Sequence, residues 1–386
     1  MEILELKKEF IKLYGEGDSR VFHSPGRINL IGEHIDYNGG YVFPCALEFG
    51  TLGCVRKRAD RRVNLASTNF DLSICVDLEN IQYKAEDDWG NYPKGVIKFM
   101  LESGYIVSGM DILISGNIPN ASGLSSSASL EVLMAVIINN LFNDKAMDRV
   151  ELVLLCQRVE NNFVGVNCGI MDQFAIGMGK KDKAILLDCS TLKYSYADIK
   201  LNQYSLVIMN TNIRRALNES KYNQRRAECD EAVENLNKKI NIKALCELDV
   251  AEFNKLEHLI EKKNVRNRAR HAITENERVK KAYDCLNEGK LHEFGELLVQ
   301  SHESLRDLYE VTGIELDTIV AEALKVKSCI GARMTGAGFG GCAIALVEKS
   351  NIDNFIKQVK ASYTILIGHE PSFYLSGIGN GTEEVL

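Results

Sequence analysis

A glycine- and serine-rich segment at residues 117–132 constrains the fold of this chain more than any other feature, because it joins a strand-like stretch to a long apolar helix-like stretch that starts at Ala128. Gly123 permits the backbone angles of a tight turn, and free N–H groups at a helix N-terminus favour an anion. A helix cap needs only one serine. Five are crowded here: Ser122, Ser125, Ser126, Ser127 and Ser129. The sequence therefore predicts a strand–loop–helix unit that binds phosphate.

Two common nucleotide-binding motifs do not fit this chain. The serine-rich loop lacks the Gly-Lys-Ser/Thr ending of a Walker A motif, which excludes a P-loop NTPase at this position. A second glycine cluster at residues 336–341 is followed by a strand-like stretch, whereas the glycine motif of a dinucleotide-binding fold opens a helix. We predict that this second cluster is a glycine turn packed near another loop.

The mixture of strand-like and helix-like segments predicts an α+β fold with two domains. A chain of 386 residues is long for a single core. A boundary near residue 200 gives domains at 1–200 and 201–386. Strands are expected again near the end of the chain, at 331–334, 342–346, 363–367 and 373–376. A short basic run at 56–62 lies between two strand candidates and is interpreted as a solvated hairpin turn.

Charge and cysteine content argue against several classes of protein. The net charge of −7 disfavours a nucleic acid or a membrane surface as a partner. Eleven cysteines occur without a C-x-x-C pair, which disfavours a zinc site and favours reduced thiols. The first 17 residues have the pattern of an amphipathic helix rather than of a signal peptide, and no run of 18 apolar residues occurs. A cytoplasmic protein is expected.

Several stretches resemble one known family. The segment SPGRINLIGEHIDYNGGYVFPCAL at 24–47 resembles the galactokinase signature. GLSSSAS at 123–129 and MTGAGFGG at 334–341 resemble the second and third motifs of the wider GHMP kinase family, which joins galactokinases with homoserine, mevalonate and phosphomevalonate kinases. Two further stretches, VENNFVGVNCGIMDQF at 159–174 and ESKYNQRRAEC at 219–229, add to the similarity. The resemblance runs in order along almost the whole chain.

The resemblance implies a fold and an activity. The implied fold has an N-terminal ribosomal-protein-S5-like domain and a C-terminal ferredoxin-like domain, with the active site in the cleft between them. The implied activity is transfer of the γ-phosphoryl group of ATP to the C1 hydroxyl of D-galactose. Magnesium would accompany ATP, and galactose and ATP would be the ligands of a monomeric enzyme.

The resemblance also implies catalytic and metal-associated residues. Asp172 matches the catalytic base, although a lone aspartate in a loop is more often a turn former. Arg27 matches the arginine beside the base, where a permanent charge would stabilise the transition state; a surface ion pair is the alternative. Ser127 and Glu160 match the positions associated with Mg²⁺, which prefers hard oxygen ligands. A solvated helix carboxylate is the alternative for Glu160.

The remaining implied residues bind the two substrates. By resemblance, Asp36 bonds the C3 and C4 hydroxyls of the sugar, while Glu33 and His34 face the C6 hydroxyl; a lone histidine such as His34 is more often structural. The implied sugar-binding residues are Glu33, His34, Asp36, Gly169, Asp172 and Tyr222. The implied nucleotide-binding residues are Gly123, Leu124, Ser125, Ser126, Ser127, Ala128 and Ser129, with Trp89 and Tyr92 flanking the adenine. A place in the hydrophobic core is the alternative for the two aromatic residues.

Two alternative functions are considered. A kinase for another sugar of galactose configuration, such as N-acetylgalactosamine or arabinose, would use the same fold. The intact stretches DYNGG at 36–40 and CGIMDQF at 168–174 favour galactose over N-acetylgalactosamine. A non-catalytic galactose sensor is a different class of protein, and the complete GLSSSAS loop argues against it.

Overall fold

The first part of the chain and its last strand form a mixed six-stranded sheet in the computed structural model, which describes residues 2–119, 122–213 and 218–386. The strand order is β13-β1-β3-β6-β4-β5, and among these neighbours only β4 and β6 are parallel. The strands are β1 (Arg20–Asn29), β3 (Pro44–Lys57), β4 (Arg62–Ser67), β5 (Ile74–Asp77), β6 (Met110–Gly116) and β13 (Glu383–Glu384).

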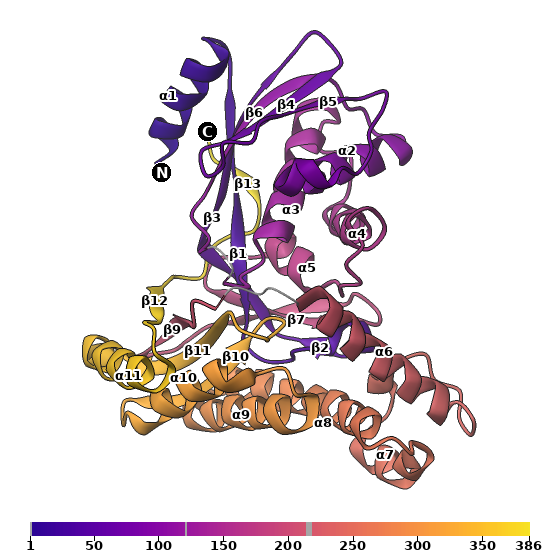
Figure 1. Cartoon of the computed structure of the whole chain (residues 1–386), viewed down its shortest axis with the longest axis vertical. Coiled ribbons are helices and arrows are strands. Elements are labelled where there is room, and N and C mark those ends of the chain that lie inside the picture. Colours follow the sequence, from indigo (N-terminus) through magenta and orange to yellow (C-terminus); the bar gives the residue numbers. More distant parts are fainter. Residues whose placement is uncertain (1, 120–121, 214–217) are drawn as a thin grey trace.

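Helices cover both faces of this sheet (Figure 1). One face carries α2 (Asn91–Glu102), α3 (Ser126–Phe142), α4 (Arg149–Val159) and α5 (Met171–Met178), and the other carries α1 (Ile3–Tyr14). Helix α3 is buried almost all round, because it packs on β1 and β3 and is enclosed by α2, α4 and α5. A helix that is apolar on every side belongs in such a position, and the helix itself was predicted from the long apolar stretch after the serine loop.

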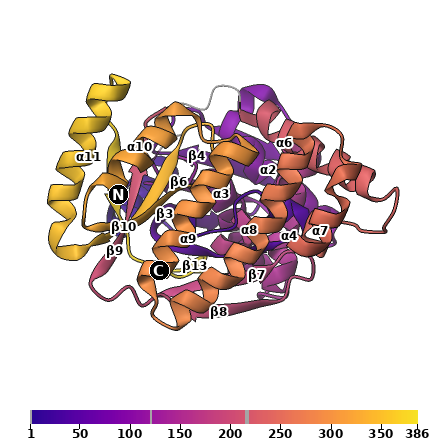
Figure 2. The same ribbon diagram turned by 90° about the horizontal axis from the view of Figure 1, so that it is seen from below.

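A second sheet lies in the later part of the chain. Its order is β10-β11-β9-β12, with every neighbour antiparallel. The strands are β9 (Tyr204–Asn210), β10 (Cys329–Thr335), β11 (Cys342–Glu348) and β12 (Ser372–Leu375). The helices around it, seen from below in Figure 2, are α8 (Lys263–Asn287), α9 (Leu291–Ser304), α10 (Gly313–Lys325) and α11 (Ile352–Ile367). Helices α6 (Asn218–Leu236) and α7 (Val250–Leu256) extend beside α8.

Short elements connect these layers. A third sheet, β2-β7-β8, consists of β2 (Tyr41–Val42), β7 (Lys183–Asp188) and β8 (Tyr194–Asp198). The 3₁₀ turns are Asp36–Asn38, Ala85–Gly90, Leu245–Glu247, Glu257–Leu259 and Lys349–Asn351, and the π-helical turns are Glu160–Val164 and Leu305–Tyr309. In the part of the chain that the structure describes, no helix has the length and apolar character needed to cross a bilayer.

The structure confirms the predicted α+β class and corrects two local expectations. The stretch 363–367 is the end of α11 and not a strand. The basic run at 56–62 does not form a hairpin turn, because β6 lies between β3 and β4. Arg56 and Arg58 instead bind the buried carboxylate of Asp111 on β6. The division at residue 200 stays a prediction; the second sheet begins at Tyr204, while β13 returns to pair with β1.

Candidate active site

A cavity of about 620 Å³ brings together residues from distant parts of the sequence. Strand β1, helices α2, α3, α5 and α6, and the second glycine cluster all contribute to its wall. Its lining consists of Arg27, Glu33, His34, Asp36, Tyr92, Ser127, Glu160, Val166, Cys168, Gly169, Met171, Asp172, Ser220, Tyr222, Gly336 and Ala337. Every residue predicted to be catalytic, sugar-binding or metal-associated is therefore in one place.

Asp172 and Arg27 form a two-pronged ion pair in this cavity. Arg27 Nε donates to Asp172 Oδ1 at 2.8 Å, and Arg27 Nη2 donates to Oδ2 at 2.7 Å. The third nitrogen of Arg27 donates to the Gly123 carbonyl at 2.6 Å, and the Ser125 hydroxyl donates to Asp172 Oδ2. The Arg27 side chain is 4% exposed and that of Asp172 is 31% exposed. A bidentate pair fixes orientation as well as charge, so the carboxylate is held rigidly while part of it remains open to the cavity.

Asp36 lies next to this pair and explains the glycine at position 169. A Cβ added to Gly169 would come within 1.9 Å of Asp36 Oδ2, so a side chain larger than hydrogen does not fit there. Burial and the neighbouring charge of Asp172 raise the pKa of Asp36 to about 6. The carboxyl group is thus enclosed, with its environment set by Gly169 and the start of α5.

Glu33 is held by the second glycine cluster. Its Oε1 accepts from the Gly336 N–H at 2.8 Å and from Arg333 Nη1 at 3.3 Å, and its Oε2 accepts from Asn29 Nδ2 at 2.7 Å. Gly338 has φ +76° and packs against the Val311 carbonyl. The predicted glycine turn near another loop is present, and it supplies a backbone donor to a carboxylate of the site.

His34 is fixed by hydrogen bonds on both sides of its ring. Nε2 lies 3.0 Å from the Ala337 carbonyl oxygen, which can only accept, so Nε2 carries the proton. Nδ1 therefore accepts from the Tyr37 hydroxyl at 2.8 Å, and that hydroxyl in turn accepts from Tyr309 at 2.8 Å. Burial lowers the pKa of His34 to about 3, which keeps the ring neutral. The ring of Tyr222 lies 5.5 Å from that of His34, so His34 shapes the wall of the cavity with both nitrogens engaged.

The metal-associated residues Ser127 and Glu160 are neighbours. The Ser127 hydroxyl bonds the Glu160 carboxyl group. Burial raises the pKa of Glu160, while a hydrogen bond from Cys168 acts to lower it. Within the described residues no group of three or more histidine, cysteine or acidic side chains is arranged to hold a metal ion. A hydroxyl and one carboxylate still fit Mg²⁺, because this ion takes its other ligands from phosphates and water.

Only part of the predicted nucleotide loop faces the cavity. Ser127 lines the cavity, Ser125 binds Asp172, and Gly123 binds Arg27. Ser129 is fully buried, and its hydroxyl donates to the Ser24 carbonyl of β1 at 2.9 Å, which is a structural contact. Leu124 and Ala128 are buried in the hydrophobic core, and Ser126 is exposed.

The two aromatic residues assigned to adenine are separated by the structure. Tyr92 lines the cavity, whereas Trp89 is buried in the core formed by α2, α3 and the first sheet. The indole Nε1 of Trp89 is buried without a hydrogen-bond partner among the described residues. The burial of Trp89 agrees with the alternative of a place in the hydrophobic core. A contact between Trp89 and adenine stays a prediction.

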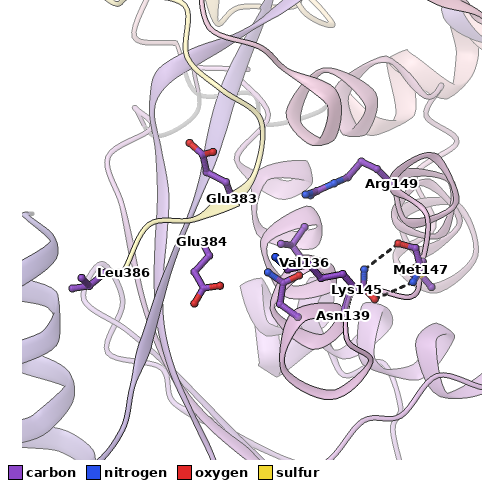
Figure 3. A pocket seen from close by; sticks show the side chains of 9 residues that line it. Val136, Asn139, Lys145, Met147, Arg149, Glu383, Glu384 and Leu386 are labelled. Atoms are coloured by element: carbon purple, nitrogen blue, oxygen red, sulfur yellow. Dashed lines mark hydrogen bonds between the residues drawn. The ribbon is translucent and has the colours of Figure 1, made fainter.

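A second cavity of about 610 Å³ lies beside the C-terminal end of α3 and the N-terminal end of α4, next to β13 (Figure 3). It is lined by Val136, Asn139, Asn140, Lys145, Met147, Arg149, Glu383, Glu384 and Leu386. None of the residues predicted from the sequence reaches it. The candidate active site is therefore the first cavity.

Comparison with known proteins identifies the family. Residues 8–57 match the galactokinase galactose-binding signature, residues 91–180 match the N-terminal domain of GHMP kinases, and residues 282–365 match their C-terminal domain. A galactokinase of Clostridium tetani is 65% identical over 385 residues, covering 100% of this chain and 98% of the relative. The chain belongs to the galactokinase family.

Other galactokinases are similarly close. That of Fusobacterium nucleatum is 55% identical over 382 residues, covering 98% of this chain and 97% of the relative. The solved structure of Lactococcus lactis galactokinase complexed with galactose matches with a TM-score of 0.97 and 48% identity, over 99% of this chain and 100% of that one. A mevalonate kinase at 20% identity matches with a TM-score of 0.65, which shows a shared fold. The expected family and the GHMP kinase fold are confirmed.

Several residues of the site were not predicted from the sequence, and the cavity wall alone adds Val166, Met171, Ser220, Gly336 and Ala337. Cys168 lines the cavity, and Gln173 and Glu131 lie buried behind it. Gln173 follows Asp172 directly, so the CGIMDQF stretch contained a signal. Glu131 gave none beyond its place in the helix that follows the serine loop.

Proposed function

We propose that this protein transfers the γ-phosphoryl group of ATP to the C1 hydroxyl of D-galactose. The observation that carries the proposal is the rigid Asp172–Arg27 pair in a cavity that also contains Asp36 and adjoins the serine loop. Phosphoryl transfer depends mainly on positioning and on neutralising charge. The pair supplies a carboxylate for the acceptor hydroxyl and a fixed cation beside it.

In this mechanism Asp172 accepts the proton of the C1 hydroxyl as that oxygen attacks the γ-phosphorus, while the bond from this phosphorus to the β–γ bridging oxygen breaks and ADP leaves. Arg27 holds the carboxylate in orientation through two hydrogen bonds and offers positive charge near the developing transition state. Because Arg27 is almost fully buried, it cannot swing away into solvent. The carboxylate therefore meets the sugar in one geometry.

Sugar recognition is assigned to the polar wall beside Asp172. Asp36 is the candidate acceptor for the C3 and C4 hydroxyls, and Gly169 gives its carboxyl group the room it occupies. Glu33, His34 and Tyr222 form the neighbouring wall. Since His34 is neutral and engaged at both nitrogens, its contribution would be shape more than hydrogen bonding.

ATP and a divalent cation are assigned to the serine loop. The N-terminus of α3 offers backbone N–H groups to phosphate oxygens, and Tyr92, which lines the same cavity, is assigned to the adenine. Ser127 and Glu160 would hold Mg²⁺, which would supply positive charge to neutralise the phosphate groups. A monomer in the cytoplasm remains the prediction for its state and location.

Replacing the metal-associated residues is expected to raise the magnesium requirement more than it weakens sugar binding. Ser127→Ala removes one oxygen ligand from the proposed magnesium site, and Glu160→Gln replaces its charged carboxylate with a neutral amide, a weaker ligand. Titration of Mg²⁺ at saturating galactose measures the half-saturating concentration in each variant. An unchanged magnesium dependence in both variants would remove these residues from the metal site.

Gly169→Ala is expected to raise the KM for galactose at least about tenfold, because a methyl group in contact with Asp36 displaces a hydrogen-bonding carboxylate. The KM for ATP should change little. Gly116→Ala is the matched control, since a Cβ there meets its neighbours only at 3.8 Å. An unaltered galactose KM in Gly169→Ala would show that Asp36 does not set sugar binding.

A coupled ADP-release assay over galactose, glucose, N-acetylgalactosamine and arabinose tests the proposed function. ADP release that depends on galactose, with galactose 1-phosphate as the product, is the expected result. Galactose binding without ADP release would indicate a sensor. Faster turnover of another sugar would overturn the assignment to galactose.

A further inference from the structure

A fully buried amide connects the proposed metal site to the helix that carries Asp172. Gln173 is the residue after Asp172 on α5, and its Nε2 donates to Glu160 Oε2 at 2.8 Å. The same nitrogen donates to Glu131 Oε2 on α3 at 3.2 Å. Both protons of one amide group are therefore used on two carboxyl groups from different elements.

The orientation of this amide follows from its partners. If the amide were turned over, its oxygen instead of a donor would face Glu160 Oε2, which already accepts a hydrogen bond from Cys168. The orientation that places the donors on Glu160 and Glu131 is therefore favoured by the contact with Glu160. Gln173 is locked in one rotamer by contacts on both sides.

Two donors meet on one oxygen of Glu160, in addition to the hydrogen bond between Glu160 and Ser127. Cys168 Sγ donates to Glu160 Oε2 at 3.1 Å, alongside Gln173 Nε2. With Oε2 occupied by two donors from the protein, Oε1 is the oxygen that can turn to a ligand in the cavity. Glu160 also opens a π-helical turn, Glu160–Val164, an irregularity that is frequent at functional sites.

The buried position of Glu131 is unfavourable for the stability of the fold. It is fully buried, and no cationic side chain in the described ranges forms an ion pair with it. Its Oε1 has no hydrogen-bond partner among the described residues. A buried polar atom without a hydrogen-bond partner lowers the stability of the fold, and the hydrogen bond to the other oxygen of Glu131 comes from Gln173.

We propose that Gln173 is a positioning residue that aims the Glu160 carboxylate at the bound cation, and that Glu131 anchors Gln173 from α3. The proposal rests on the magnesium role proposed above for Glu160. Glu131 lies one helical turn after Ser127 on the same helix, so it follows the serine loop. Gln173 then keeps three parts of the site in register: the serine loop, the metal-associated carboxylate and the helix of the base.

Gln173→Met removes the amide and keeps the length of the side chain. We expect Mn²⁺ to bind about 10–100-fold more weakly to this variant in the presence of adenylyl imidodiphosphate, as for other partners of metal ligands. Electron paramagnetic resonance of free Mn²⁺ measures this affinity without turnover. Galactose affinity, measured by calorimetry without nucleotide or metal, should stay within about twofold, because the sugar wall is untouched.

Two variants at Glu131 separate a hydrogen-bonded anchor from mere packing. Glu131→Gln keeps an acceptor oxygen for Gln173 and should bind Mn²⁺ within about twofold of the wild type, whereas Glu131→Met should reproduce the loss. The double variant Gln173→Met with Glu131→Met should be no weaker than Gln173→Met alone, because both act through one contact. The Glu131 pair also decides the question if Gln173→Met does not fold.

Three outcomes overturn the proposal. These are wild-type Mn²⁺ affinity in folded Gln173→Met, equal losses in Glu131→Gln and Glu131→Met, and a matching loss of galactose affinity in Gln173→Met. A wild-type chain without galactose kinase activity would instead overturn the proposed function. If Glu160→Gln binds Mn²⁺ normally, the metal role of Glu160 fails, and this inference fails with it.

Discussion

Asp172→Asn is expected to fold normally and to lose about 10²–10⁴-fold in kcat with galactose, the usual effect of removing a general base. An amide has the shape of the carboxylate but cannot accept the proton of the C1 hydroxyl. It also places an N–H group opposite Arg27, so one of the two hydrogen bonds of the pair is lost. The rate is measured by ADP release at saturating ATP and galactose.

The matched control is Asp353→Asn. Asp353, like Asp172, is an acid in the first turn of a helix, but it is exposed on α11 and far from the cavity. Its replacement should leave kcat unchanged. Arg27→Lys keeps the charge but not the planar fork, so it should also turn over poorly. Near-normal kcat in Asp172→Asn would exclude Asp172 as the base. Full activity in Arg27→Lys would show that Arg27 contributes only its positive charge.

The parts of the site that could be predicted from the sequence are those encoded in short continuous patterns. The serine loop predicted a turn that opens a buried helix, and Gly123, Ser125 and Ser127 lie at that turn. The 24–47 segment carries Arg27 at one end of β1 and Asp36 just beyond it. Each pattern fixes a local backbone path, so its polar side chains end up in one region.

Contacts between distant segments could not be predicted in this way. The bond from Gln173 to Glu131 joins residues 42 positions apart, and no spacing rule points to it. The stretch 363–367 was expected as a strand because it is apolar and rich in β-formers. In a longer window Phe355, Val359 and Tyr363 recur at every fourth position and are buried together on one face of a helix.

The kcat/KM for galactose is expected to be at least about 100-fold higher than the kcat/KM for glucose. The two sugars differ in the orientation of the C4 hydroxyl, and the proposed partner of that hydroxyl is Asp36. Because Gly169 packs against the Asp36 carboxyl group, this group cannot retract when its partner is misplaced. A buried polar group left unpaired costs about 1–3 kcal/mol, and more when it is charged. Since each 1.36 kcal/mol is about tenfold in rate, such a site discriminates strongly between hydroxyl configurations.

Asp36 also predicts a pH dependence. Burial raises the pKa of Asp36 to about 6, so in the free protein the group is ionised above that pH and binds a proton as the pH falls through 6. Protonation removes one acceptor, and the KM for galactose should therefore rise as the pH falls below about 6. Asp36→Asn cannot titrate and should lack this rise, while the KM for ATP should follow the same profile in both proteins. A rise of equal size in Asp36→Asn would assign the titration to another group.

Asp36→Ala should lose galactose activity far more than ATP affinity, because the side chain lies on the sugar wall. Calorimetry with adenylyl imidodiphosphate measures nucleotide binding independently of turnover, so a loss confined to galactose KM and kcat/KM is the expected pattern.

N-acetylgalactosamine should be a poor substrate as well, given the intact stretches at 36–40 and 168–174. Equal kcat/KM for galactose and N-acetylgalactosamine would exclude a site specific for galactose. It would leave the phosphoryl-transfer chemistry of Asp172 and Arg27 in place, because that chemistry acts on the C1 hydroxyl, which both sugars share.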